Sequence, residues 1–234
     1  GVTGGSRTAF DTGRAAIHAA EEIFRLMTAS AALIWAMEEQ AISFDKGTFY
    51  CAKTEDTVTF KALSARLMGT GGPISCSISE ASPGSGPIIA GNIVDVEVDP
   101  ETGKVDILRY TAFMDVGTAI HPSYVEGQIQ GGTVQGIGWA LNEGYVYDEN
   151  GTMLNSSFLD YRMPTSLDVP MIDAVMIEVP NAKHPFGVRG VGEAPIIPPL
   201  PALAIAVSNA IGVKMNSLPL TPDVILDALE SKGG

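Results

Sequence analysis

Val94-Asp95-Val96-Glu97-Val98-Asp99 is followed directly by Pro100-Glu101-Thr102-Gly103, and this stretch decides the fold. In a β-strand successive side chains point to opposite faces, so the three valines share one face and the acidic residues share the other. Proline and glycine at 100–103 predict a tight turn, and residues 105–116 predict the returning strand. The stretch therefore predicts an antiparallel hairpin whose apolar face other elements must cover.

Helices and further strands are predicted on both sides of this hairpin. A long helix is expected from Asp11, which can cap it, with one face formed by Ala16, Ala20, Ile23, Phe24 and Met27. Shorter helices are expected at 60–68, 122–142, 199–211 and, with Thr221 as N-cap, 222–229. Strands or hairpins are expected at 42–50, 145–151 and 172–179. These elements follow no regular βαβ period, so the predicted class is α+β.

The composition predicts a folded, acidic protein. Of 234 residues, 45% are hydrophobic and only 18% are charged, and the net charge is −13 at pH 7. The low charged fraction suggests that more protein normally covers part of the surface. Because an acidic surface repels phosphate groups, and no Lys/Arg cluster offsets it, nucleic acid and anionic membranes are excluded as partners.

The sequence also predicts the cellular location of the chain. Every long apolar stretch is interrupted before about 18 residues, so we expect no membrane span. The first residues lack both an initiator Met and the features of a signal peptide. We therefore expect a cytoplasmic chain that was processed or cut from something longer.

The cysteines and histidines do not predict a metal site. Cys51 and Cys76 follow no ligand spacing, so two reduced thiols are expected rather than bound zinc or an iron–sulfur cluster. His18, His121 and His184 also fit no ligand motif. No side chain of this chain is expected to ligate a metal.

The predicted helix at 122–142 carries five glycines, at 127, 131, 132, 136 and 138. Each interior glycine costs about 1 kcal/mol relative to alanine, so something must need the bare surface. One interpretation is tight packing against another helix. The other is a bulky ligand, for which the amides of Gln128 and Gln135, nearly on one face, suit a pterin or nucleobase edge.

Glu193 stands alone in a frame of glycine and proline over residues 185–201. Glycine permits close approach to the backbone, and proline fixes the turn. A lone carboxylate among apolar neighbours favours general acid–base chemistry. The alternative is a glutamate that caps the following helix, and the pattern alone leaves both open.

Four stretches, in this order along the chain, share motifs with one known family. They are Thr3-Gly4-Gly5-Ser6-Arg7-Thr8; residues 96–104; Asp115-Val116-Gly117 with Val125-Glu126-Gly127-Gln128 and Val134-Gln135-Gly136; and Gly190-Val191-Gly192-Glu193-Ala194-Pro195 with Leu218-Pro219-Leu220-Thr221-Pro222. Nearly the whole chain resembles the molybdenum hydroxylases related to xanthine dehydrogenase and aldehyde oxidase. The resemblance implies their molybdenum-cofactor-binding fold and an oxidoreductase function.

The resemblance also implies a role for the glutamate. Glu193 matches the residue that acts as base toward a molybdenum-bound hydroxyl, whose oxygen passes to an electron-poor carbon while hydride leaves it. The implied reaction is the oxidation of a heteroaromatic or aldehyde-type carbon with water as the oxygen source.

The same resemblance implies the cofactor and its contacts. Gln135 matches a glutamine that hydrogen-bonds molybdopterin, and Ser6 and Thr8 match hydroxyl positions that bind it. Gly4 and Gly5 match small residues beside the metal. The implied cofactor is molybdopterin with molybdenum, in its cytosine dinucleotide form.

The parts of the family's proteins that this chain does not match predict its partners. Residues 1–234 resemble the C-terminal part of the molybdopterin-binding region, as two interleaved α+β subdomains with boundaries near 92 and 195. The expected partners are the remaining N-terminal half of the molybdenum subunit, modules carrying FAD and [2Fe-2S], and a small-molecule substrate. The isolated chain is therefore expected to be inactive.

Two other functions stay open on the sequence. One is a scaffold or assembly subunit that keeps the fold without the chemistry, although a scaffold has no need for Glu193, Gln135 and Ser6 together. The other is a carbon monoxide dehydrogenase, which depends on a copper partner from the absent half. The substrate is open among purines, other heteroaromatics, aldehydes and thioesters.

Overall fold

The computed structural model describes residues 2, 4–81, 84 and 86–233. The chain divides into two compact units, one of residues 1–10 with 83–234 and one of residues 11–82. Residues on both sides of the boundary expected near 195 belong to one unit, and the boundary expected near 92 stays a prediction. Thr3 and Pro83, which the sequence motifs include, lie outside the described residues.

The smaller unit is built on the long helix α1 (Thr8–Trp35), which begins in the larger unit. An antiparallel sheet of β1 (Ile42–Asp45), β2 (Thr48–Cys51) and β3 (Thr57–Thr59) follows it. The predicted hairpin is confirmed, with Lys46 and Gly47 at positive φ in its two-residue turn. Its core residues are Met27, Ala31, Phe49, Val58, Leu63 and Leu67.

Three predictions for this unit were wrong in detail. Helix α1 begins at Thr8, so Asp11 lies in its first turn rather than at its cap. Of the predicted apolar face, Met27 is buried and Ile23 packs against the core, but Ala16 and Ala20 are exposed, and Phe24 is 39% exposed although its ring contacts Phe44 and Phe60. The helix expected at 60–68 is split into α2 (Phe60–Ser64) and the 3₁₀ turn η2 (Leu67–Gly69).

The larger unit confirms the predicted hairpin and the α+β class. Strand β4 (Ala90–Val98) pairs antiparallel with β5 (Val105–Asp115), and along β4 the half-buried valines alternate with exposed Asp95 and Glu97. Strand β6 (Ile172–Ile177) joins β5 in parallel. The connection from β5 to β6 runs through α3 (Pro122–Leu141), so the fold contains one βαβ unit.

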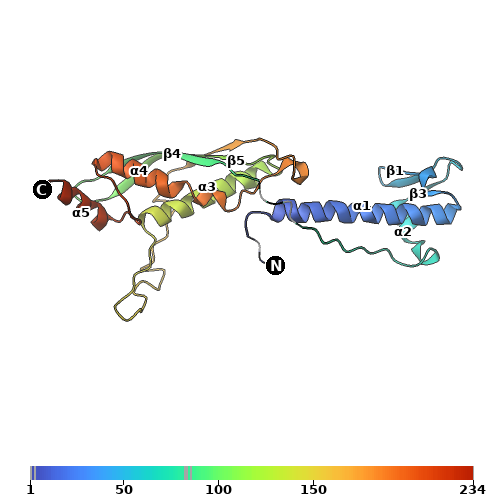
Figure 1. Ribbon diagram of the computed structural model, residues 1–234, viewed down its shortest axis with the longest axis horizontal. Helices are drawn as coiled ribbons and strands as arrows, with labels where there is room; N and C mark the ends of the chain where they lie inside the picture. The colour runs from blue at the N-terminus through green and yellow to red at the C-terminus, as the bar shows by residue number, and fades with distance from the viewer. Residues whose placement is uncertain (1, 3, 82–83, 85, 234) are drawn as a thin grey trace. The chain divides into compact units, whose positions relative to one another are not determined.

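Helices α3 and α4 (Pro199–Ile211) lie along the sheet of this unit (Figure 1). The core between sheet and helices includes Tyr110, Met114, Ile129, Ile137, Leu203 and Val207. Helix α5 (Pro222–Gly233) follows Thr221, as predicted, but runs longer than the expected 222–229. The predicted hairpin after residue 145 forms only a single bridge, between Tyr147 and Met153.

The expectation that no segment has the length and hydropathy of a membrane span was wrong. Residues 194–211 form an 18-residue window with a mean hydropathy of 1.6. In the structure this window comprises a 3₁₀ turn and α4, and α4 buries Leu203, Val207 and Ile211 in the core. Core helices pass the same test, so the finding is weak evidence for a membrane.

Candidate functional site

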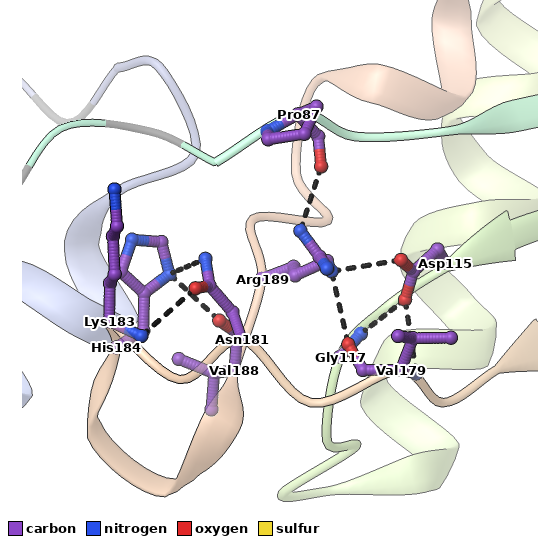
Figure 2. Close-up of polar contacts among 9 residues, drawn as sticks. All are labelled: Pro87, Asp115, Gly117, Val179, Asn181, Lys183, His184, Val188 and Arg189. Carbon is purple, nitrogen blue, oxygen red and sulfur yellow. Dashed lines mark hydrogen bonds and ion pairs between the residues drawn. The ribbon is translucent and has the colours of Figure 1, made fainter.

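The loop that carries Glu193 begins at a buried ion pair. Arg189 Nε lies 2.9 Å from Asp115 Oδ2, and the two side chains are only 13% and 11% exposed. The other carboxylate oxygen of Asp115 accepts the backbone N–H groups of Gly117 and Val179. Arg189 also donates to the carbonyl oxygen of Pro87 (Figure 2). This network ties four separate backbone segments together four residues before Glu193.

A second anchor holds the segment between β6 and the loop. His184 is buried and stacks on Phe10, with ring centroids 3.9 Å apart. Its Nδ1 lies 2.8 Å from the carbonyl oxygen of Val188 and 3.1 Å from the amide of Asn181 (Figure 2). Since Phe10 lies four residues after Ser6, this stack holds the start of the chain near the Glu193 loop.

Ser6 contacts Glu193 directly, across 187 positions of sequence. The backbone N–H of Glu193 donates to Ser6 Oγ at 2.9 Å, and the hydroxyl donates to Glu193 Oε2 at 3.3 Å. Ser6 has φ of 53°, a left-handed conformation that costs energy for a residue with a Cβ. A Cβ on Gly190 would lie 2.6 Å from Ser6 Cβ, so the close approach requires glycine there. The left-handed backbone of Ser6 and its close contact with Gly190 thus place the Ser6 hydroxyl against the Glu193 carboxylate.

The Glu193 side chain is exposed and faces an open pocket of about 360 Å³. Its lining includes Gly5, Ser6, Ile88, Glu193, Ala194 and Ile197. The apolar enclosure expected around this carboxylate is therefore not supplied by the described part of the chain. Glu193 precedes the 3₁₀ turn η4 (Ala194–Ile196), and its side chain makes no capping hydrogen bond there. The capping alternative is thereby contradicted.

The other predicted site residues are more dispersed. Gln135 is exposed on α3 and lines a second pocket of about 300 Å³, together with Trp139, Tyr161 and Ile196. Thr8 is exposed at the first residue of α1. Gly4 precedes Gly5 and Ser6. The structure thus brings Gly5, Ser6 and Glu193 into one pocket and places Gln135 in another. The residues that follow Glu193 line both pockets, Ala194 and Ile197 the first and Ile196 the second.

The five glycines of α3 fall into two groups, with Gly132, Gly136 and Gly138 packed and Gly127 and Gly131 open. Close packing therefore explains only part of them, and a ligand at the open glycines stays a prediction. A Cβ on Gly132 would lie 2.7 Å from Pro195 Cβ, and a Cβ on Gly136 would lie 2.7 Å from the carbonyl oxygen of Ile196. These glycines let the Glu193 loop pack on the helix. Around Gly127 and Gly131, by contrast, nothing in the described structure lies within 4 Å of a built Cβ. Their face of the helix is open.

This division predicts opposite effects of alanine at two positions on α3. Gly136→Ala is expected to destabilise the fold by about 1–3 kcal/mol, because the methyl group meets backbone and proline. Gly131→Ala is expected to stabilise it by up to about 1 kcal/mol, because alanine is the better helix former. Urea unfolding followed by tryptophan fluorescence measures both. Shifts of the two variants in the same direction would contradict the division.

Sequence reasoning missed several residues of the site. Asp115 and Arg189 could have been noticed in the sequence, because one is a carboxylate at the end of an apolar strand and the other is an arginine in an apolar loop. Nothing in the sequence indicates that these two residues form an ion pair. Gln128 was noted but not assigned, and its Oε1 would lie 3.8 Å from a Cβ on Gly192. It therefore belongs beside Ser6 and Glu193. Among the described residues, no group of three His, Cys, Asp or Glu side chains is arranged to hold a metal ion.

Comparison with known proteins identifies the family. The family model of the molybdopterin cofactor-binding domain matches residues 1–170. The chain belongs to this family. The resemblance found in the sequence is confirmed, and so is the fold, which is that of molybdenum-cofactor-binding domains in solved oxidoreductases.

Three relatives show the range of this family. The putative xanthine dehydrogenase molybdenum-binding subunit of Escherichia coli K12 is 37% identical over 164 residues, 70% of this chain and 22% of that protein. CO dehydrogenase of Oligotropha carboxidovorans superposes with a TM-score of 0.79 at 26% identity, covering 99% of this chain and 30% of the other. Quinoline 2-oxidoreductase of Pseudomonas putida 86 gives 0.76 at 27% identity, with 97% and 30% covered. The chain thus spans less than a third of each of these relatives.

Proposed function

We propose that this chain is part of a molybdenum hydroxylase that oxidises a heteroaromatic or aldehyde-type carbon, with Glu193 as general base and water as the oxygen source. The observation that carries the proposal is the contact of Ser6 with Glu193 at the mouth of a pocket. A scaffold has no need for a strained serine that orients an exposed carboxylate. The reaction class and the residue roles come from the resemblance to the family, and this geometry supports them for Ser6 and Glu193.

The chain offers surfaces that fit a large flat cofactor. The four glycines at 4, 5, 127 and 131 all have open space where a Cβ would stand. The exposed amides of Gln128 and Gln135 can both donate and accept, as the edge of a pterin requires. We propose that these residues, with the hydroxyls of Ser6 and Thr8, hold the cofactor in its cytosine dinucleotide form. When bound, it supplies a metal that activates a water-derived oxygen and accepts electrons.

Glu193 is proposed to move the proton. One of its carboxylate oxygens accepts the Ser6 hydroxyl, which leaves Oε1 to take a proton from the oxygen nucleophile. The Glu193 N–H contact to the same hydroxyl fixes the backbone from which the side chain extends. The base is thus oriented before substrate enters, and this reduces the entropy cost of the transfer.

The proposed enzyme is larger than this chain. Because the chain spans less than a third of its relatives, we propose that the rest of a molybdenum subunit completes the pocket and that FAD and [2Fe-2S] lie on other domains or subunits. The relatives' names refer to xanthine, carbon monoxide and quinoline, so no single substrate is proposed. A cytoplasmic location stays a prediction.

The assembled enzyme tests this function. Molybdenum and pterin content would be measured, and candidate substrates would be oxidised in ¹⁸O-labelled water. We expect molybdenum bound in proportion to active sites and the label in the product. Enzyme without molybdenum, or product labelled only from ¹⁸O₂, would contradict the proposal.

The isolated chain gives a separate prediction. Purified alone and mixed with cofactor, it is expected to retain much less than one molybdenum per chain and to show no turnover, because its pocket is open to solvent. Metal analysis after gel filtration measures this. One molybdenum per chain would contradict the prediction.

A further inference from the structure

An arm of residues 143–163 projects from the sheet and helices of the larger unit (Figure 1). Much of its surface is apolar. Its exposed large apolar side chains, 52–86% accessible, are Tyr145, Val146, Tyr147, Leu154, Phe158, Leu159 and Met163. Scattered single apolar residues are normal on a protein surface, but seven on this one segment favour an interaction site.

The arm is an ordered structure, not an unfolded loop. At its base Asn155 donates to the carbonyl oxygen of Gly144 at 2.6 Å and accepts the N–H of Val146 at 2.9 Å. At its tip the N–H groups of Thr152 and Asn150 bond to Asp148 and lower its pKa, so the turn is held by a charged carboxylate. These bonds present the apolar side chains to solvent on a fixed frame, which reduces the entropy lost on binding.

The two ends of the arm are fastened to each other and to α3. The hydroxyl of Tyr161 donates to Glu143 at 2.7 Å, and this contact raises the pKa of Tyr161 to about 12. The N–H of Glu143 in turn donates to the carbonyl oxygen of Gly138 on α3. Beside this base lies a pocket of about 840 Å³, which has apolar lining from Phe158 and Met163 of the arm and charged lining that includes Lys104, Asp106, Arg162 and Asp168. The arm therefore borders a hollow of mixed polarity that can seat a further segment.

We infer that the arm and this pocket dock the part of a molybdenum-binding subunit that this chain does not contain. Solved relatives carry the matched fold as 30% of one longer chain, so in those proteins most of the same polypeptide lies outside the matched part. The low charged fraction of 18% agrees with a surface that more protein covers. The inference rests on the proposed function only in that the chain works inside a larger molybdenum subunit.

Site-specific photo-crosslinking in the assembled enzyme tests the inference. Phe158, which is 86% exposed, is replaced by benzoylphenylalanine, and the control position is Ile93, which is 56% exposed on β4 and pairs with Thr111, away from the residues that line the pocket. After irradiation, mass spectrometry identifies the linked peptides. We expect adducts at 158 with peptides of the molybdenum subunit that lie outside these 234 residues, and none at 93.

Other results would overturn the inference. They are adducts at 158 with a second copy of this chain or with an iron–sulfur or flavin subunit, and no adduct at all. A second measurement covers poor folding of the crosslinking variant: maleimide labelling of Phe158→Cys and Ile93→Cys in native enzyme. Slow labelling at 158 and fast labelling at 93 support docking, and equal rates overturn it. Neither readout uses molybdenum or turnover, so failure here and failure of the proposed chemistry are distinguishable.

Discussion

Glu193→Gln in the assembled enzyme is expected to lower kcat by about 10²–10⁴-fold, the range that general bases contribute, while molybdenum content stays unchanged. The amide is nearly the same size and can still contact the Ser6 hydroxyl, but it cannot accept the proton. Steady-state kinetics and metal analysis on the same preparation measure the two quantities. KM should change little, because the lost interaction forms only in the transition state.

Unchanged activity would reduce Glu193 to a structural residue, and loss of both metal and activity would make it a cofactor contact instead. Glu230 on α5 provides the matched control, since it is an exposed glutamate that lines neither the Glu193 pocket nor the Gln135 pocket. Glu230→Gln should leave kcat within about twofold, as surface substitutions usually do.

Ser6 allows the orientation of the base to be tested separately from its proton transfer. Ser6→Gly keeps the left-handed backbone and removes the hydroxyl, whereas Ser6→Ala also adds strain at φ of 53°. We expect both to lower kcat about tenfold, because the hydrogen bond that orients the Glu193 carboxylate is lost. An effect of Ser6→Ala alone would mean that the backbone matters and the hydroxyl does not.

The local elements were predictable, and the contacts between them were not. The valine alternation in β4 is periodic, so the sequence alone indicates this strand. The Ser6–Glu193 contact joins residues 187 positions apart and depends on packing at Gly190, which leaves no periodic signal. For the same reason the sequence could not say which α3 glycines are packed and which are open.

The family resemblance singled out site residues that periodicity does not indicate, but it did not predict their contacts or their exposure. It singled out Glu193 and Ser6 but did not predict the contact between them, which the structure shows; the cofactor role of Ser6 stays a prediction. An apolar surrounding for Glu193 was expected from its neighbours in sequence. Two of these neighbours, Pro195 and Pro199, instead pack against glycines of α3, and the Glu193 side chain is left exposed. Neighbours in sequence are not neighbours in space at a turn.

Breaking the ion pair beneath the Glu193 loop is expected to have the largest effect on stability. Arg189→Leu leaves Asp115 charged and mostly buried, with two backbone N–H donors but no cation, and should cost about 3–5 kcal/mol. Asp115→Leu should cost a similar amount for the opposite charge. The double variant should cost much less than the sum, because it leaves no unpaired charge behind. Urea unfolding of all four proteins gives the coupling energy directly.

A surface pair of the same length provides the control. Arg109 Nε lies 2.9 Å from Asp95 Oδ2, but these side chains are 72% and 50% exposed. Water and salt screen such a pair, so Arg109→Leu should cost less than about 1 kcal/mol. Equal costs for the two pairs would mean that burial does not set the strength of the Asp115–Arg189 contact. If burial does set it, Arg189→Leu should also reduce kcat in folded enzyme, because the loop that aims Glu193 loses its anchor at the end of β5.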